Sequence, residues 1–171
     1  GNVLKVIESL GVPRVLCIPD EYLAHYVATQ TKVKILSWKG KCEVHELFTG
    51  EDIQTFRDSM DDVVVVAHPE CPPDVIRAAD FTGSTAEMTA YVRQHRPSNV
   101  LLLTECSMSS NIAAELPDVK FVPSCGLCPH MKRITLPKIR RALETMSPVV
   151  TVDPAIAARA RAAVERMLAV V

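Results

Sequence analysis

Two unbroken runs of apolar residues constrain the fold of this chain more than any other feature of its sequence. The segment at 63–68 reads VVVVAH, and the segment at 99–105 reads NVLLLTE. A strand with one face in water alternates apolar and polar residues, whereas these runs are apolar on both faces, as in parallel sheets covered by helices on each side. The sequence therefore predicts an α/β fold with parallel sheets.

Helical segments separate the strands along the whole chain, as in sheets built from crossover connections. Thr49 is predicted to cap one helix, with acidic residues in its first turn, and Asp153 with Pro154 is predicted to start the last helix. The predicted strands are 14–19, 33–38, 63–68, 99–105, 120–124 and 149–152. The predicted helices are 21–30, 49–60, 72–80, 84–95, 109–116, 136–146 and 154–171.

Charge and composition exclude several classes of partner. The 171 residues carry 19 Lys and Arg against 20 Asp and Glu, a formal net charge of −1, so we expect no nucleic acid or membrane partner. No apolar run reaches the ~18 residues that a membrane helix needs. Six cysteines in a chain that is 48% hydrophobic are typical of a cytoplasmic protein with metal-binding or catalytic thiols.

Polar and sulfur-containing side chains follow the predicted strands, at the point where each strand ends. Ligands of open parallel sheets bind at the carboxyl ends of the strands, so these positions are the candidate site. They hold Pro19-Asp20, Cys42 with His45, His68-Pro69-Glu70-Cys71, Thr104-Glu105-Cys106, and Ser124-Cys125 leading to Cys128.

The C-x-x-H and C-x-x-C motifs together form a four-ligand set. In one interpretation Cys42, His45, Cys125 and Cys128 hold zinc as the staple of a non-catalytic α/β module. A redox dithiol at Cys125 and Cys128 is a second interpretation, although such motifs normally open the first βαβ unit and this one lies near the end of the chain. An iron–sulfur cluster with ligands from separate loops is a third. Spacing alone does not choose among the three.

Two further motifs have both a structural and a functional interpretation. His68 ends a strand and Glu70 precedes the helix at 72–80, so the pair either satisfies local hydrogen bonds or takes part in chemistry. Ser84 and Thr85 start a helix, where hydroxyls and free backbone N–H groups either cap the helix or bind an anion.

The order of these motifs resembles the quinolinate synthase family of NAD biosynthesis. The matching segments are PDEYLAHYVA (19–28), WKGKCEVHELFT (38–49), AHPECPPDV (67–75), ADFTGST (79–85), TE (104–105) and CPHMKRITL (128–136). The resemblance implies an enzyme that condenses iminoaspartate with dihydroxyacetone phosphate to quinolinate, with loss of phosphate and water. It also implies an L-aspartate oxidase or dehydrogenase that supplies iminoaspartate.

The resemblance implies a fold and a cofactor as well. The fold is one of three-layer αβα domains with parallel sheets, pseudo-repeated around a central [4Fe–4S] cluster. Three cysteines hold the cluster, and its fourth iron binds substrate as a Lewis acid. Cys42 and Cys128 would be two of the three ligands, Cys125 a neighbour outside the ligand set, and Cys71 a packing residue.

The remaining matched positions carry implied roles in catalysis and substrate binding. His45 and His68 would contact carboxylate or carbonyl oxygens of the substrate. Glu70 would act as the general acid or base. Ser84 and Thr85, at the start of their helix, would hold a carboxylate or the phosphate.

By the same resemblance, the chain covers the later part of a longer protein. Residues 1–42 are predicted to be the second half of the middle domain, and 43–124 the third domain. Residues 125–171 are predicted to hold the cluster-ligand loop and a C-terminal segment that packs on the first domain. The third cluster cysteine is predicted to lie upstream of Gly1. We therefore expect this chain alone to hold no stable [4Fe–4S] cluster and to make no quinolinate.

Overall fold

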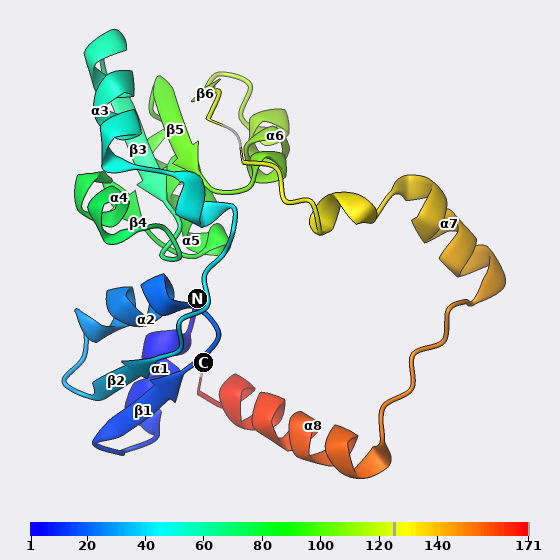
Figure 1. Ribbon diagram of the computed structural model, residues 1–171. Helices are drawn as coiled ribbons and strands as arrows, with labels where there is room; N and C mark the ends of the chain where they lie inside the picture. The colour runs from blue at the N-terminus through cyan, green and yellow to red at the C-terminus, as the bar shows by residue number, and fades with distance from the viewer. Residues whose placement is uncertain (125, 171) are drawn as a thin grey trace. The chain divides into compact units, whose positions relative to one another are not determined.

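The computed structural model describes residues 1–124 and 126–170, and the chain divides into two compact units (Figure 1). The first unit contains residue 1 and residues 12–127, and the second contains residues 2–11 and the chain from Cys128 onward. The predicted α/β class with parallel sheets is confirmed. The predicted domain boundaries and the pseudo-repeat stay predictions.

A four-stranded parallel sheet forms the centre of the first unit, in the order β4-β3-β5-β6. Val63 of β3 pairs with Asn99 of β5, which in turn pairs with Lys120 of β6. β4 was not predicted, because a strand of two residues leaves no apolar run in the sequence. The strands are β3 (Val63–Ala67), β4 (Phe81–Thr82), β5 (Asn99–Leu103) and β6 (Lys120–Val122).

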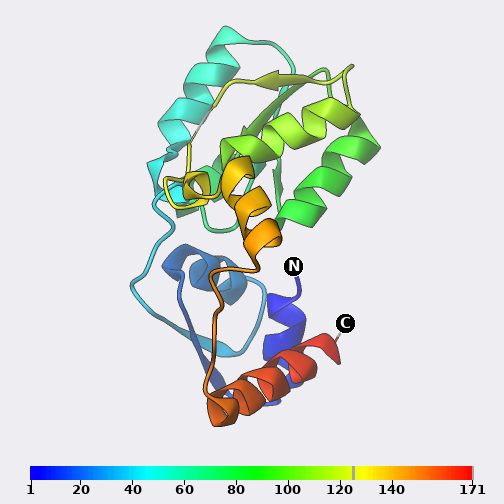
Figure 2. The same ribbon diagram turned by 90° about the vertical axis from the view of Figure 1, so that its right-hand side faces the viewer.

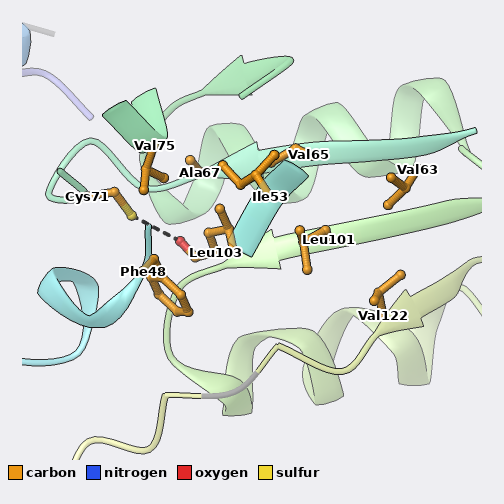
Figure 3. Close-up of a cluster of buried hydrophobic side chains, with 10 residues drawn as sticks. All are labelled: Phe48, Ile53, Val63, Val65, Ala67, Cys71, Val75, Leu101, Leu103 and Val122. Carbon is orange, nitrogen blue, oxygen red and sulfur yellow. Dashed lines mark hydrogen bonds between the residues drawn. The ribbon is translucent and has the colours of Figure 1, made fainter. Parts of the chain in front are cut away.

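Helices α3 (Gly50–Ser59) and α4 (Pro73–Ala78) cover one face of this sheet (Figure 1). Side chains alternate between the faces of a strand, so every second residue of β3 points to this side. Val65 and Leu101 pack there against Ile53 of α3 and Val75 of α4, as Figure 3 shows. Thr49 caps α3 as predicted: its hydroxyl accepts the backbone N–H of Asp52 at 3.1 Å.

Helices α5 (Thr85–His95) and α6 (Cys106–Glu115) cover the other face (Figure 2). Val66 and Leu102 pack there against Met88 of α5 and Ile112 of α6, which completes a three-layer αβα arrangement. α6 begins earlier than the predicted 109–116, because the Glu105 carboxylate accepts the backbone N–H of Ser107 at 2.8 Å and caps the helix there.

A second, two-stranded parallel sheet pairs β1 (Arg14–Cys17) with β2 (Lys34–Ser37) through α2 (Glu21–Ala28). The expectation that apolar strands are covered on both faces is wrong here. Leu16 is 62% exposed, and it alternates with the half-buried Val15 and Cys17. Within the described residues, only one face of this sheet is therefore covered.

The second unit is helical in the residues that the structure describes. Asp153 caps α8 as predicted, because one carboxylate oxygen accepts the backbone N–H groups of Ala155 at 2.9 Å and Ile156 at 3.1 Å. No described helix is both long and apolar enough to cross a membrane. The helices are α1 (Val3–Ser9), the 3₁₀ turn η2 (Met131–Arg133), α7 (Leu136–Thr145) and α8 (Pro154–Leu168).

The predicted strand at 149–152 is wrong. The segment VVTV has a high strand propensity, but a strand forms only where a second strand accepts and donates its backbone hydrogen bonds. No described strand pairs with this segment, and Val149 and Val150 are exposed.

Candidate functional site

The carboxyl ends of the four parallel strands bring the candidate residues of the first unit to one edge of the sheet. His68 follows β3, and its backbone N–H donates to the carbonyl of Leu103 at the end of β5 (3.2 Å). Gly83 follows β4, and its N–H donates to the carbonyl of Ala67 at the end of β3 (3.2 Å). The parallel register thus aligns His68, Thr104 and the start of α5 along the edge where ligands of such sheets bind.

His45 has a hydrogen-bond partner at each nitrogen of its ring. It opens the 3₁₀ turn η1 (His45–Leu47), and it is 7% exposed. Its Nδ1 lies 3.1 Å from Oε2 of Glu70, and its Nε2 lies 3.0 Å from the hydroxyl of the buried Thr104. The two contacts fix the orientation of the ring and aim one nitrogen at a carboxylate.

His68 stacks on His45, with ring centroids 4.4 Å apart and ring planes 6° from parallel. Burial, together with the charge of the neighbouring His45 when protonated, lowers the pKa of His68 to about 4. At neutral pH His68 is therefore a neutral imidazole, and its Nδ1 accepts the backbone N–H of Glu70 at 3.3 Å.

Glu70 is the carboxylate of this cluster. The hydrogen bond from His45 holds the pKa of Glu70 below its ordinary value, although partial burial acts in the opposite direction. Its side chain is 27% exposed, and Oε2 lies 3.8 Å from Nδ1 of His68. An ionised, accessible carboxylate beside two imidazoles can accept a proton and return it.

Asp20 fixes the loop that carries Cys42 to the exit of β1. Its Oδ2 accepts the backbone N–H of Cys42 at 3.0 Å, and its Oδ1 accepts that of Leu23 at 2.7 Å, which caps α2. Gly40 forms a β-bridge with Asp20, where a side chain at Gly40 would lie 2.4 Å from the carbonyl oxygen of Pro19. Only glycine allows this approach. Burial raises the pKa of Asp20, against the effect of its backbone hydrogen bonds.

Three metal-ligating side chains meet at this point of the first unit. Ligand atoms of Cys42, His45 and Glu70 all lie within 4.8 Å of one another. Thiolate sulfur, imidazole nitrogen and carboxylate oxygen are all donors that transition metals take in proteins.

Cys128 belongs to the second unit and is a free thiol. Its sulfur accepts the backbone N–H of Met131 at 3.5 Å, a contact of the kind that surrounds metal-bound thiolates. Cys125 lies outside the described residues. The zinc set of Cys42, His45, Cys125 and Cys128 therefore stays a hypothesis, and so does the pairing of Cys42 and Cys128 as cluster ligands.

Cys71 packs in the core, as expected for the cysteine of the HPEC motif (Figure 3). Its thiol donates to the carbonyl oxygen of Leu103 at 3.5 Å. Burial raises the pKa of Cys71 to about 12, so the thiol is protonated at neutral pH and is a poor metal ligand.

Ser84 precedes α5 and Thr85 is its first residue, as predicted. The hydroxyl and backbone N–H of Ser84 both donate to Oε2 of Glu87, at 2.5 and 2.7 Å, and these bonds lower the pKa of Glu87. Ser84 thus takes part in local capping. An anion-binding role for Ser84 and Thr85 stays a prediction, which their position at the ligand-binding edge of the sheet favours.

Sequence reasoning gave Asp20 and Thr104 no role, although both were noted at strand exits. Asp20 holds a residue 22 positions away, and Thr104 holds one 59 positions away. The strand-exit rule places each of them at the correct edge, but the identity of a distant partner leaves no local pattern in a sequence.

Comparisons with known proteins show what this chain is similar to. Residues 1–169 match the family described as Quinolinate synthetase A protein. The chain is 64% identical over 170 residues to a quinolinate synthase of Xylella fastidiosa (strain 9a5c), covering 99% of this chain and 50% of that protein. It is 63% identical over 168 residues to a quinolinate synthase of Agrobacterium fabrum, covering 98% and 49%. The chain spans about half the length of the curated relatives it matches.

Proposed function

This chain belongs to the quinolinate synthase family, and from that membership we propose that it is the part of a quinolinate synthase that carries its acid–base residues. The proposed reaction condenses iminoaspartate with dihydroxyacetone phosphate, giving quinolinate, phosphate and two waters in NAD biosynthesis. The observation that carries the proposal is the 3.1 Å contact of His45 with Glu70 beside Cys42. A condensation with two dehydrations needs repeated proton transfers close to an electrophilic centre.

A [4Fe–4S] cluster is the cofactor of this proposal, and the donor chemistry of the chain fits it. Cys42 and Cys128 are both free thiols that are not fully buried, unlike Cys71. We propose these two as ligands, with the third thiolate from an upstream cysteine of the longer protein. When bound, the cluster supplies a Lewis-acidic iron for a substrate oxygen.

Each residue of the cluster around Glu70 has a distinct proposed task. Ionised Glu70 takes a proton from the condensing substrates at Oε2 and returns it to the departing hydroxyl as water leaves. His45 hydrogen-bonds Oε2 and keeps the carboxylate ionised between these steps. Neutral His68 contacts substrate oxygens without adding a second positive charge.

The two substrates carry several negative charges, which need their own binding groups. Ser84 and Thr85, with the backbone N–H groups at the start of α5, are proposed to hold a carboxylate or the phosphate. Iminoaspartate is an imine that water hydrolyses. An L-aspartate oxidase or dehydrogenase is therefore the proposed supplier of this substrate.

The test replaces Glu70 in the whole protein that contains this chain. Glu70→Gln keeps the size of the side chain but removes its basicity, and kcat should fall about 100-fold or more while the iron and labile sulfide content stays unchanged. Glu46→Gln is the matched control, because Glu46 lies on the same turn and pairs with Lys41 at 2.8 Å on the surface. An unchanged rate of quinolinate formation in the Glu70 variant would remove its acid–base role.

A further inference from the structure

We propose that Cys42, His45 and Glu70 form a binding site for a single divalent transition-metal ion, such as Zn²⁺. The site lies wholly within the first unit and uses no cysteine from the C-x-x-C motif. It is distinct from an iron–sulfur cluster and does not rest on the proposed function.

The donor set matches the chemistry of zinc. Zn²⁺ takes sulfur at about 2.3 Å and nitrogen or oxygen at about 2.0–2.2 Å, and catalytic zinc sites use three protein ligands and keep one position open. Such bond lengths place the ligand atoms of a tetrahedral ion about 3.5 Å apart. His45 Nδ1 and Glu70 Oε2 already lie 3.1 Å apart, and all three ligand atoms lie within 4.8 Å. A small shift of the half-exposed Cys42 closes the set.

The groups behind the ligands hold them in position. The hydroxyl of Thr104 lies 3.0 Å from Nε2 of His45, the usual place for a partner that orients a metal-bound imidazole through its second nitrogen. Asp20 accepts the backbone N–H of Cys42 at 3.0 Å and so anchors the loop that carries the sulfur. Two of the three ligands are therefore oriented without the ion.

The charges around the site favour a cation. Glu70 and Asp20 contribute carboxylates, and metal binding would convert the Cys42 thiol to a thiolate by release of its proton. Lys41, the neighbouring cation in the sequence, is directed elsewhere: its ammonium group pairs with Glu46 at 2.8 Å and lies 4.9 Å from the centre of the Tyr22 ring. The charge of a divalent ion would offset the carboxylates and the thiolate together.

Co²⁺ is the probe, because its visible spectrum reports both geometry and sulfur ligation. The 171-residue chain, stripped of metal by a chelator and kept reduced without oxygen, is titrated with Co²⁺. We expect one equivalent to bind, with intense tetrahedral d–d bands and a sulfur-to-cobalt charge-transfer band. Addition of Zn²⁺ should abolish both, because zinc binds such sites more tightly than cobalt does.

Substitutions then identify the ligands. Cys42→Ser should remove the charge-transfer band, and His45→Ala and Glu70→Gln should each weaken Co²⁺ binding about tenfold or more. Cys128→Ser and Cys17→Ser are the matched thiol controls and should leave the spectrum unchanged. Thr104→Val keeps all three ligands and should weaken binding about tenfold, so it tests the site even if a ligand variant fails to fold.

The contrary results are equally definite. Loss of the charge-transfer band in Cys128→Ser, or its survival in Cys42→Ser, would overturn the proposed ligand set. An octahedral, sulfur-free cobalt spectrum in the unsubstituted chain would do the same. Neither result bears on quinolinate formation by the whole protein, so the failure of this site and the failure of the proposed function are distinguishable.

Discussion

The two parallel sheets of the first unit have similar sequences and different surroundings. β1 and β2 read RVLC and KILS, and β3 and β5 read VVVVA and NVLLL. Leu101 of β5 is 0% exposed, whereas Leu16 of β1 is 62% exposed. The difference shows that an apolar run specifies an extended strand, whereas its burial depends on whether helices cover both faces.

The two sheets also differ in what they bring to the candidate site. The half-covered sheet contributes Asp20 after β1 and Cys42 after β2, and the fully covered sheet contributes His68 after β3 and Thr104 after β5. His45, on the connection between the sheets, contacts Thr104 of the covered sheet. The proton-transfer groups thus lie on the more rigidly packed element, and the thiol lies on the less covered one.

The largest expected effect tests the difference in burial. Leu101→Ala should lower the free energy of unfolding by about 3 kcal/mol, because it leaves a cavity in a fully buried layer. Leu16→Ala, its counterpart in β1, should change that free energy by less than about 0.5 kcal/mol. Urea denaturation followed by circular dichroism measures both. Equal losses would mean that Leu16 is buried in solution.

A smaller effect distinguishes the carboxylates that brace each sheet. Asp20→Asn leaves one oxygen for the two N–H groups of Leu23 and Cys42, and should cost about 1–2 kcal/mol of stability. It should also weaken Co²⁺ binding about tenfold, because the Cys42 loop loses its anchor.

Asp80→Asn is the control in the covered sheet, where Asp80 accepts the backbone N–H of Val65 at 2.8 Å and pairs with Arg57. It should lower stability by a similar amount without changing the affinity for Co²⁺. Parallel losses of metal affinity in both variants would contradict a specific role for Asp20.

The smallest effect concerns the start of α5 on the covered sheet. Glu87→Gln should cost about 0.5 kcal/mol at pH 7, a modest amount because the contact with Ser84 is exposed. The hydrogen bonds lower the pKa of Glu87 from 4.5, so its stabilising contribution is present above pH 4.5 and is lost as the pH falls through the folded-state pKa. Urea titrations at several pH values should therefore show the two proteins converging in acid. A difference that widens there would contradict the assignment.

Local patterns in the sequence predicted much of the fold. Apolar runs located the strands that form both sheets, and Thr49 and Asp153 marked the starts of α3 and α8. The same reasoning failed at 149–152, because strand propensity does not reveal whether a pairing partner exists. It also missed β4, whose two residues are held by pairing with β3 rather than by their own sequence.

The candidate site was predicted by residue type more fully than by contact. The strand-exit rule and the family resemblance indicated Cys42, His45, His68 and Glu70, and the structure brings ligand atoms of three of them together. The stacking of His45 on His68 depends on how two connections fold over one sheet edge. No spacing between the residues encodes it. Only packing distinguished Cys71 from a metal ligand.

The stacked imidazoles of His45 and His68 give this protein a built-in spectroscopic reporter. Each ring lies over the face of the other, at 4.4 Å between centroids, so the ring current of one displaces the carbon-bound proton resonances of the other upfield. Those resonances would return toward their free positions whenever the two rings separate. A one-dimensional proton spectrum would therefore follow assembly of the site directly, without substrate, metal or turnover.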